Sequence, residues 1–175
     1  MTEIPKRTLR AHREALAANP LAYSYDFPRL RETAVNHLRQ CGFNRVTLTR
    51  CPKLVDQFVA LIFESQDRLP FFHVEGHLPF CWNSPKAWDK NYISYEWGHV
   101  RSRNQNQDAH QIDNLCLQSA RCNQHIQTSM DIEEVILWLA GSPVAERARQ
   151  VLNKRKELFA SENWKNLLKE LESFR

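Results

Sequence analysis

The chain changes the spacing of its hydrophobic residues twice, and these two changes limit the folds that are open to it. Up to about residue 65 the apolar residues recur at helical spacing, most clearly in the run LVDQFVALIF. Residues 92–100 are rich in aromatic and β-branched residues, and residues 113–119 alternate apolar with polar ones, as strands do. After residue 131 the helical spacing returns. We therefore expect an α+β fold in which a short strand-rich segment is embedded in a mostly helical protein.

Ordinary start and stop signals bound the helical segments. Gly42 follows the second segment, and Ser161 is placed to cap the last one. Within that last segment Trp164, Leu167 and Leu171 lie on one stripe, which is typical of core packing. The predicted helices are 6–18, 28–40, 52–65, 131–140, 143–159 and 162–174.

A length of 175 residues is that of one compact domain, and 42% hydrophobic residues are enough to bury a core. We expect a single domain, 1–175, with a basic helical region at 1–66, a strand-rich region at 70–128 and a helical region at 131–175. No apolar run approaches the roughly 18 residues that span a bilayer, and the first residues lack the apolar stretch of a secretory signal. An intracellular protein without a membrane partner is the expectation.

Positive charge is concentrated towards the two ends of the chain. Residues 1–53 contain ten Lys or Arg and four acids, a net charge of +6, whereas the whole chain carries +4. Residues 143–175 are also basic and the middle is acidic, so the flanks could grip a polyanion. The alternative is a set of solvated helix surfaces with no partner.

The five cysteines are scattered and form no CxxC pair, which argues against a disulfide framework or a zinc ribbon. We expect reduced thiols. A zinc site built from Cys81, Cys116, Cys122 and His125 would match no standard ligand spacing, so structural zinc is not expected.

The central segment reads as strand, loop, strand and helix. YISYEWGHV at 92–100 favours a strand, RSRNQNQDAHQ is polar throughout and favours a loop, and DNLCLQS at 113–119 favours a second strand. ARCNQHIQTS follows directly and can form a helix. In this order His99 ends the first strand, Asn114 opens the second, and Asn123 lies on the helix.

This arrangement, with Glu96-Trp97-Gly98-His99 and the sequence NLCLQSARCN, resembles the HNH family of nucleases, also called ββα-metal finger or His-Me finger endonucleases. The resemblance covers about residues 92–128, roughly a fifth of the chain. It implies a ββα-metal finger that hydrolyses phosphodiester bonds with Mg²⁺ or Mn²⁺. It further implies that His99 is the general base, that Asn123 is a metal ligand, and that Asn114 orients the loop and the histidine.

The residue types suit that chemistry on physical grounds as well. Histidine has the side-chain pKa closest to neutrality, so a histidine at a strand end beside a polar loop can act as a base. An asparagine carbonyl oxygen is a hard ligand that suits Mg²⁺, which keeps most of its waters when few protein groups bind it.

One position departs from the common family pattern. Many members carry Asp or His directly before the catalytic histidine as a second metal ligand, whereas this chain has Gly98. The motif is similar to the Asp-Arg-Gly-His of the related non-specific DNA/RNA nucleases, which hold the metal through one asparagine, and Glu96 then retains the acidic position. On this interpretation Glu96, Gln127 or Asp131 would support the metal through water. The alternative is an inactive nucleic-acid-binding module that keeps the finger fold.

The remaining expectations concern the substrate. Arg101, Arg103 and Arg121 bracket the motif and are candidates for binding phosphate. His125 is a further candidate, with a solvent-facing position on the helix as the alternative. Double-stranded DNA is the expected partner because it is the commoner substrate of the family, and a restriction-like, phage or mobile-element enzyme is the expected setting. A homodimer would supply the two sites that cutting both strands requires. A protein-interaction domain is the third possibility.

Overall fold

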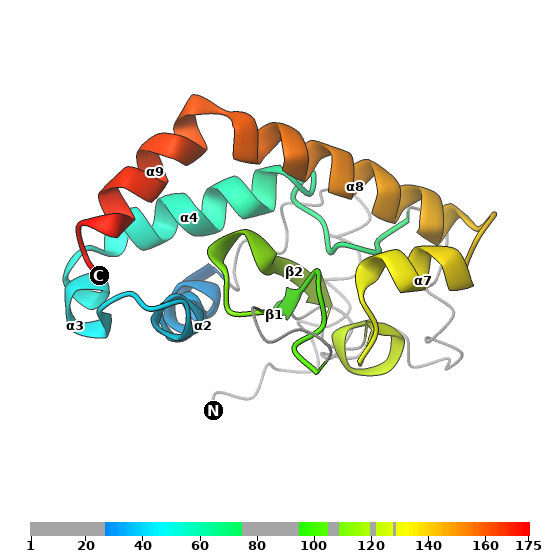
Figure 1. Ribbon diagram of the computed structural model, residues 1–175, viewed down its shortest axis with the longest axis horizontal. Helices are drawn as coiled ribbons and strands as arrows, with labels where there is room; N and C mark the ends of the chain where they lie inside the picture. The colour runs from blue at the N-terminus through cyan, green and yellow to red at the C-terminus, as the bar shows by residue number, and fades with distance from the viewer. Residues whose placement is uncertain (1–26, 75–94, 105–108, 120–121, 128) are drawn as a thin grey trace, which may run out of the picture.

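A two-stranded antiparallel sheet lies at the centre of the protein, and helices from both ends of the chain surround it (Figure 1). The computed structural model describes residues 27–74, 95–104, 109–119, 122–127 and 129–175. The strands are β1, Tyr95–His99, and β2, Leu115–Ser119, with His99 opposite Leu115 and Trp97 opposite Leu117. Both strands fall inside their predicted segments. The coarse α+β class is thereby confirmed.

The helices before the sheet are α2, Phe27–Gln40, α3, Arg45–Arg50, and α4, Pro52–Glu64. The predicted helices at 28–40 and 52–65 are confirmed, and the predicted helix at 6–18 lies outside the described residues. Helix α3 was not predicted. It forms because the Asn44 side chain accepts hydrogen bonds from the backbone N–H groups of Val46 and Thr47, which caps a helix of only six residues.

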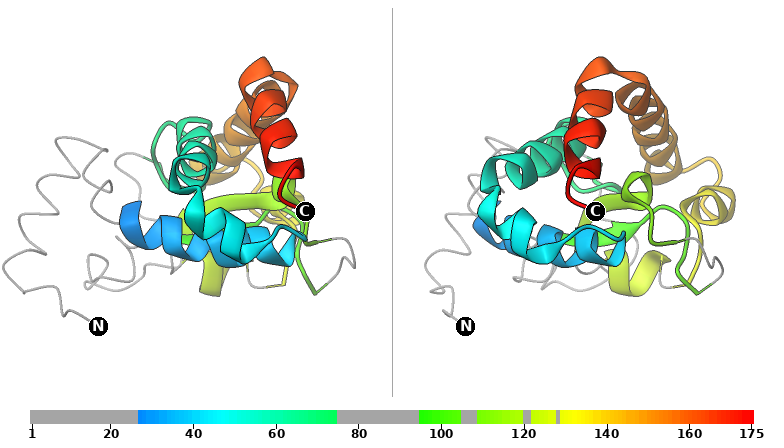
Figure 2. Two further views of the ribbon diagram at one scale, coloured as in Figure 1. Left: turned by 90° about the vertical axis from the view of Figure 1, so that its left-hand side faces the viewer. Right: turned by 60° about the vertical axis from the view of Figure 1, so that its left-hand side comes forward.

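The helices after the sheet are α7, Ile132–Trp138, α8, Pro143–Ala160, and α9, Glu162–Glu172, close to their predicted bounds. The Ser142 and Ser161 hydroxyls accept from backbone N–H groups at the starts of α8 and α9, as the sequence predicts for Ser161. In Figure 1 α8 and α9 form an arch above α4, and Figure 2 shows α2 lying along the opposite side of the sheet.

A helical turn follows β2, but its form differs from the expectation. The segment η3, Asn123–Gln127, is a π-helix, and a short 3₁₀ turn, η2, Ile112–Asn114, precedes β2. Single π-helical turns are often found at functional sites. The order strand, loop, strand, helical turn is present.

Each face of the sheet packs against its own hydrophobic cluster, because neighbouring strand residues point to opposite faces. Trp97, Leu115 and Leu117 pack with residues of α2, α3, α4 and α9. Cys116 lies on the other face and packs with Cys122 and with α7 and α8. Both side chains are buried, and Cys81, the further cysteine of the zinc alternative, lies outside the described residues.

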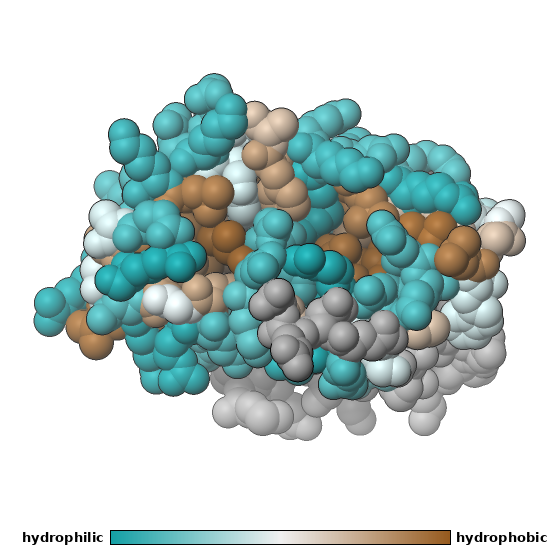
Figure 3. All heavy atoms as spheres, viewed as in Figure 1, coloured by the Kyte–Doolittle hydropathy of each residue, from teal (hydrophilic) through white to brown (hydrophobic). Residues whose placement is uncertain are grey.

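The surface is polar over most of the face shown in Figure 3, with hydrophobic residues gathered along its α7 and α8 side. Leu137 and Trp138 of α7 are 74% and 58% exposed. None of the described helices is both long and apolar enough to cross a membrane.

Candidate functional site

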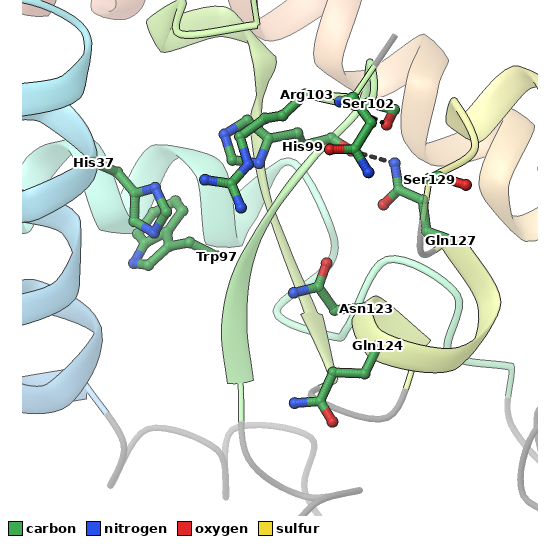
Figure 4. Close-up of a pocket in the computed structure, with 10 residues that line it drawn as sticks. His37, Trp97, His99, Ser102, Arg103, Asn123, Gln124, Gln127 and Ser129 are labelled. Atoms are coloured by element: carbon green, nitrogen blue, oxygen red, sulfur yellow. Dashed lines mark hydrogen bonds between the residues drawn. The ribbon is translucent and has the colours of Figure 1, made fainter.

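A cleft of about 440 Å³ extends across both faces of β1, and its lining includes His99 and Asn123. One side is formed by His37 of α2 and Trp97, and the other by residues of η3, as Figure 4 shows. His99 and Asn123 therefore share one cleft although strand alternation and the turn after β2 bring them in from different faces of the sheet. The lining residues in the described part of the chain are His37, Trp97, His99, Ser102, Arg103, Asn104, Asn123, Gln124, Gln127 and Ser129.

His99 ends β1 and is only 8% exposed. Its Nε2 is buried and has no hydrogen-bond partner among the described residues. Burial, followed by the positive charge of Arg103 and the neighbouring His37 and His110, lowers the pKa of His99 to about 4. The imidazole is consequently neutral at pH 7, which is the state that can accept a proton.

Asn123 is held by the acid of the EWGH motif. Its Nδ2 donates to Glu96 Oε2 at 3.3 Å, and Gln124 Nε2 donates to the same carboxylate at 3.3 and 3.4 Å. Because the amide nitrogen is engaged with Glu96, the carbonyl oxygen Oδ1 is directed away from it, and Figure 4 shows this oxygen pointing towards the side of the cleft where His99 and Gln127 lie. Glu96 thus orients the predicted ligand by direct contact.

Gly98 is required by packing against two amide side chains. A Cβ atom at this position would lie 2.6 Å from Gln118 Nε2 and 3.0 Å from Asn123 Oδ1. Neither distance is tolerable without a shift of the neighbouring side chain. The space into which a side chain at position 98 would project is taken by the amides of Gln118 and Asn123.

A chain of buried amides joins β2, η3 and the backbone of His99. Gln118 Nε2 donates to Gln127 Oε1, and Gln127 Nε2 donates to the carbonyl oxygen of His99. Gln127 lines the cleft on the same side as Asn123, as their four-residue separation predicts, and its amide contacts the backbone that carries the candidate base. Its predicted support of a metal through water is untested.

The segment after β1 is fixed by two side chains. Asn114 Oδ1 accepts from the backbone N–H of Arg101 at 2.7 Å, and its Nδ2 donates to the carbonyl oxygens of Arg101 and Ala109 at 3.0 and 2.9 Å. Asp131 Oδ1 accepts from the backbone N–H of Ser102. Asn114 therefore holds both ends of the loop. The Asp131 carboxylate binds the loop instead of lining the cleft, which differs from its expected role as a metal support.

The structure separates two of the predicted phosphate-binding arginines, Arg101 and Arg103. Arg103 lines the cleft, whereas Arg101 Nη2 donates to Gln111 Oε1 at 2.9 Å and is not part of the lining. Arg121 and the side chain of His125 lie outside the described residues. Of the arginines that can be placed, only Arg103 is positioned to meet a ligand in the cleft.

Several residues in and around the cleft were not singled out in the sequence, and His37 and Gln118 have the most consequence for the site. His37 lies on α2, 62 positions before His99, and Gln118 lies inside β2. A signal for His37 was present, since it follows Ala34 by three residues and so borders the apolar stripe of its helix. A polar side chain at the edge of a buried stripe needs a hydrogen-bond partner. The sequence therefore indicates that such a contact exists, although it does not show with which residue.

A divalent metal would find few protein ligands in this cleft. Among the described residues no three His, Cys, Asp or Glu side chains are grouped so that they could hold a metal ion. The donor set that remains is the Asn123 oxygen with Glu96 behind it, which suits a hard ion that keeps most of its waters. A single carboxamide oxygen of this kind is a ligand type that Mg²⁺ accepts.

Taken together, the cleft offers a neutral imidazole, a carboxamide oxygen and a guanidinium group around one volume. These groups are able to accept a proton, to bind a hard cation and to bind an oxyanion. No protein-family model, curated protein or solved structure matches this chain.

Proposed function

We propose that this protein is a divalent-metal-dependent endonuclease that hydrolyses phosphodiester bonds in DNA, with the hairpin and η3 acting as a ββα-metal finger. The observation that carries the proposal is that His99, Asn123 and Arg103 line the same cleft. These are three of the residue types that phosphodiester hydrolysis requires, and they come from three separate segments of the chain.

Each side chain has a defined part in the reaction. His99, neutral at pH 7, accepts a proton from the attacking water through its ring nitrogen. Arg103 binds a non-bridging phosphate oxygen and holds the phosphodiester in place. Asn123 would hold Mg²⁺ or Mn²⁺ through Oδ1, with Glu96 fixing the carboxamide. A divalent ion bound there supplies neutralisation of the charge that develops on the phosphate and the departing 3′ oxygen.

Two amide side chains fix the position of the base, His99, relative to Arg103 and Asn123. Gln127 binds the carbonyl oxygen of His99, and Asn114 binds the backbone immediately after it. Because a misplacement of about 1 Å is enough to slow an enzyme strongly, fixing the strand end is a functional need and not only a structural one.

The alternative, an inactive nucleic-acid-binding module, draws on the absence of a ligand side chain at Gly98. The close approach of Gln118 and Asn123 gives that glycine a packing reason. Gly98 is therefore compatible with an active site that uses one asparagine. The exposed basic residues of the first helices, among them Arg39, Arg45, Arg50 and Lys53, would serve either function by holding the DNA backbone.

A plasmid-nicking assay with Mg²⁺, Mn²⁺ or EDTA tests the proposal. We expect His99→Ala to lower metal-dependent cleavage by roughly 10²- to 10⁴-fold, the usual contribution of a positioned general base. His73→Ala is the matched control, because His73 lies near Pro143 and Arg147, away from this cleft. Cleavage that His99→Ala leaves intact would remove His99 from its role as base.

Binding measurements separate the alternatives. Salt-dependent retention of duplex DNA without cleavage under any of the metals would favour the binding module, whereas no retention at low salt would favour a protein-interaction domain. Parallel assays on single-stranded DNA and on RNA define the substrate class.

A further inference from the structure

The wall of the cleft opposite η3 contains a second histidine. His37 projects from α2 towards β1, with its ring centroid 5.8 Å from that of His99 and 6.3 Å from that of Trp97 (Figure 4). It is partly buried, and its Nδ1 is buried without a hydrogen-bond partner in the described part of the chain. Two imidazoles, each with an unpaired buried nitrogen, therefore line one cleft.

The charges around the pair have one sign. His99 faces His37 from β1, and Arg103 and His110 act on it from the segment that joins the strands. The described lining of the cleft contains no Asp or Glu side chain, and its remaining members are amides, hydroxyls and Trp97. This wall is suited to an anion, and the carboxylate of Glu96 on β1 is engaged with Asn123 and Gln124 on the opposite wall.

An anion bound here would satisfy buried ring nitrogens to which the described residues make no hydrogen bond. A buried ring nitrogen without a partner costs free energy, and a ligand oxygen that accepts from it recovers that cost. Burial, followed by the charges of Arg103 and His110, lowers the pKa of His37 to about 4. A negative charge placed beside His37 counters the repulsion from Arg103 and favours the protonated form of His37.

We propose that His37 is a phosphate-contacting histidine, which with Arg103 binds an anionic phosphodiester oxygen beside His99 and takes up a proton from solvent on binding. The identity of the anion as a phosphodiester rests on the function proposed above, whereas the anion site itself does not. The proton moves from solvent to an imidazole ring nitrogen, and no covalent bond of the anion changes. In catalysis His37 holds the phosphate while His99 accepts the proton of water.

The test uses sulfate as the probe in metal-free protein, because sulfate keeps a fixed double charge between pH 4 and pH 8. Histidine ring signals are followed by NMR across this range, with and without sulfate at constant ionic strength. The His37, His99 and His73 signals are assigned in the wild-type protein by triple-resonance experiments that link each ring to its own backbone. We expect saturating sulfate to raise the pKa of His37 and to leave the pKa of His73 unchanged.

The affinity for sulfate gives a second readout. We expect His37→Gln to weaken sulfate binding roughly tenfold, the loss of one charge-assisted hydrogen bond. Affinity for the wild-type protein should rise as pH falls from 7 towards 5, by up to about tenfold per pH unit for one proton taken up. His73→Gln is the matched control and should bind sulfate as the wild type does.

Three results would overturn the proposal: no binding of sulfate, a rise in the pKa of His99 alone, or unchanged affinity in a folded His37→Gln. The wild-type titration does not depend on the variant, so a variant that fails to fold leaves the test intact. If the wild type cleaves DNA but His37 does not respond to sulfate, only this inference fails. If sulfate raises the pKa of His37 in a protein that cleaves no DNA with any metal, the endonuclease proposal fails and the anion site stands.

Discussion

The two faces of the central hairpin are built on different principles. One face presents Trp97, Leu115 and Leu117 to a hydrophobic core, and the Trp97 Nε1 donates to the Leu30 carbonyl oxygen at 3.1 Å. The other presents Gly98 and Gln118 to amide side chains of η3, and it contains a buried oxygen, Gln118 Oε1, without a partner in the described part of the chain. The first face contributes large apolar side chains to its core, whereas the second combines Cys116, part of the other hydrophobic cluster, with hydrogen-bonded amides.

The comparison teaches where a substitution should cost stability and where it should cost function. Neighbouring residues of one strand fall on opposite sides of this division because strand side chains alternate. Leu117 and Gln118 are adjacent in sequence but lie on opposite faces, and so do Trp97 and Gly98. We expect the first residue of each pair to matter mainly for stability and the second mainly for function.

The largest expected effect is on the apolar face. Leu117→Ala removes a fully buried side chain, and we expect it to lower the free energy of unfolding by about 2–5 kcal/mol. Chemical denaturation measures the loss, and DNA cleavage per folded molecule should change little. Leu137→Ala is the matched control, because Leu137 is 74% exposed and its truncation should stay within about 0.5 kcal/mol. Equal costs for the two variants would contradict the placement of the core.

A smaller cost in stability but a larger cost in function is expected on the polar face. Gly98→Ala forces Gln118 or Asn123 to move, and we expect a loss of about 1–3 kcal/mol together with a higher Mg²⁺ requirement for cleavage. Denaturation and cleavage as a function of Mg²⁺ concentration measure the two effects.

Gly141→Ala serves as the comparison for that variant. A Cβ at Gly141 meets nothing within 4 Å, but its φ of +83° makes alanine strained. This variant should lose stability and keep the wild-type metal requirement. If Gly98→Ala also kept that requirement, Asn123 would not be the metal-binding group of the cleft.

The smallest effect concerns the end of the strand, where the two faces meet, and depends on pH. His37 and His99 have their pKa lowered from the ordinary value of 6.5 to about 4, so the unfolded chain binds more protons than the folded protein between these values. The free energy of unfolding should therefore fall as pH decreases from about 6.5 towards 4. Urea midpoints at pH 7 and pH 5 test this.

Replacing both histidines isolates their share of the pH dependence. We expect the double variant His37→Gln, His99→Gln to show a smaller decrease in stability between pH 7 and pH 5 than the wild type. His73→Gln should retain the wild-type decrease. An unchanged slope in the double variant would show that these two imidazoles are as accessible to protons in the folded protein as in the unfolded chain.

Much of the fold could be predicted because its signals are local. The periods of the apolar residues placed α2, α4, α8 and α9 to within a few residues, and alternation placed β1 and β2. The short helix α3 escaped, since six residues hold too little periodicity and its start depends on the cap at Asn44. The turn after β2 was predicted as helical, but its π geometry was not, because residue preferences do not distinguish one π turn from one α turn.

The candidate site was predicted in its residue types but not in its geometry. By itself the sequence determined the α+β class, the strand order and the spacing of His99, Asn114 and Asn123 along the chain, because these depend on neighbouring residues. Only the tertiary structure decided that His37 meets His99, that Arg103 and not Arg101 lines the cleft, and that Gly98 makes room for Gln118. Such contacts join residues distant in sequence or depend on which rotamer a loop permits, and no local pattern encodes either.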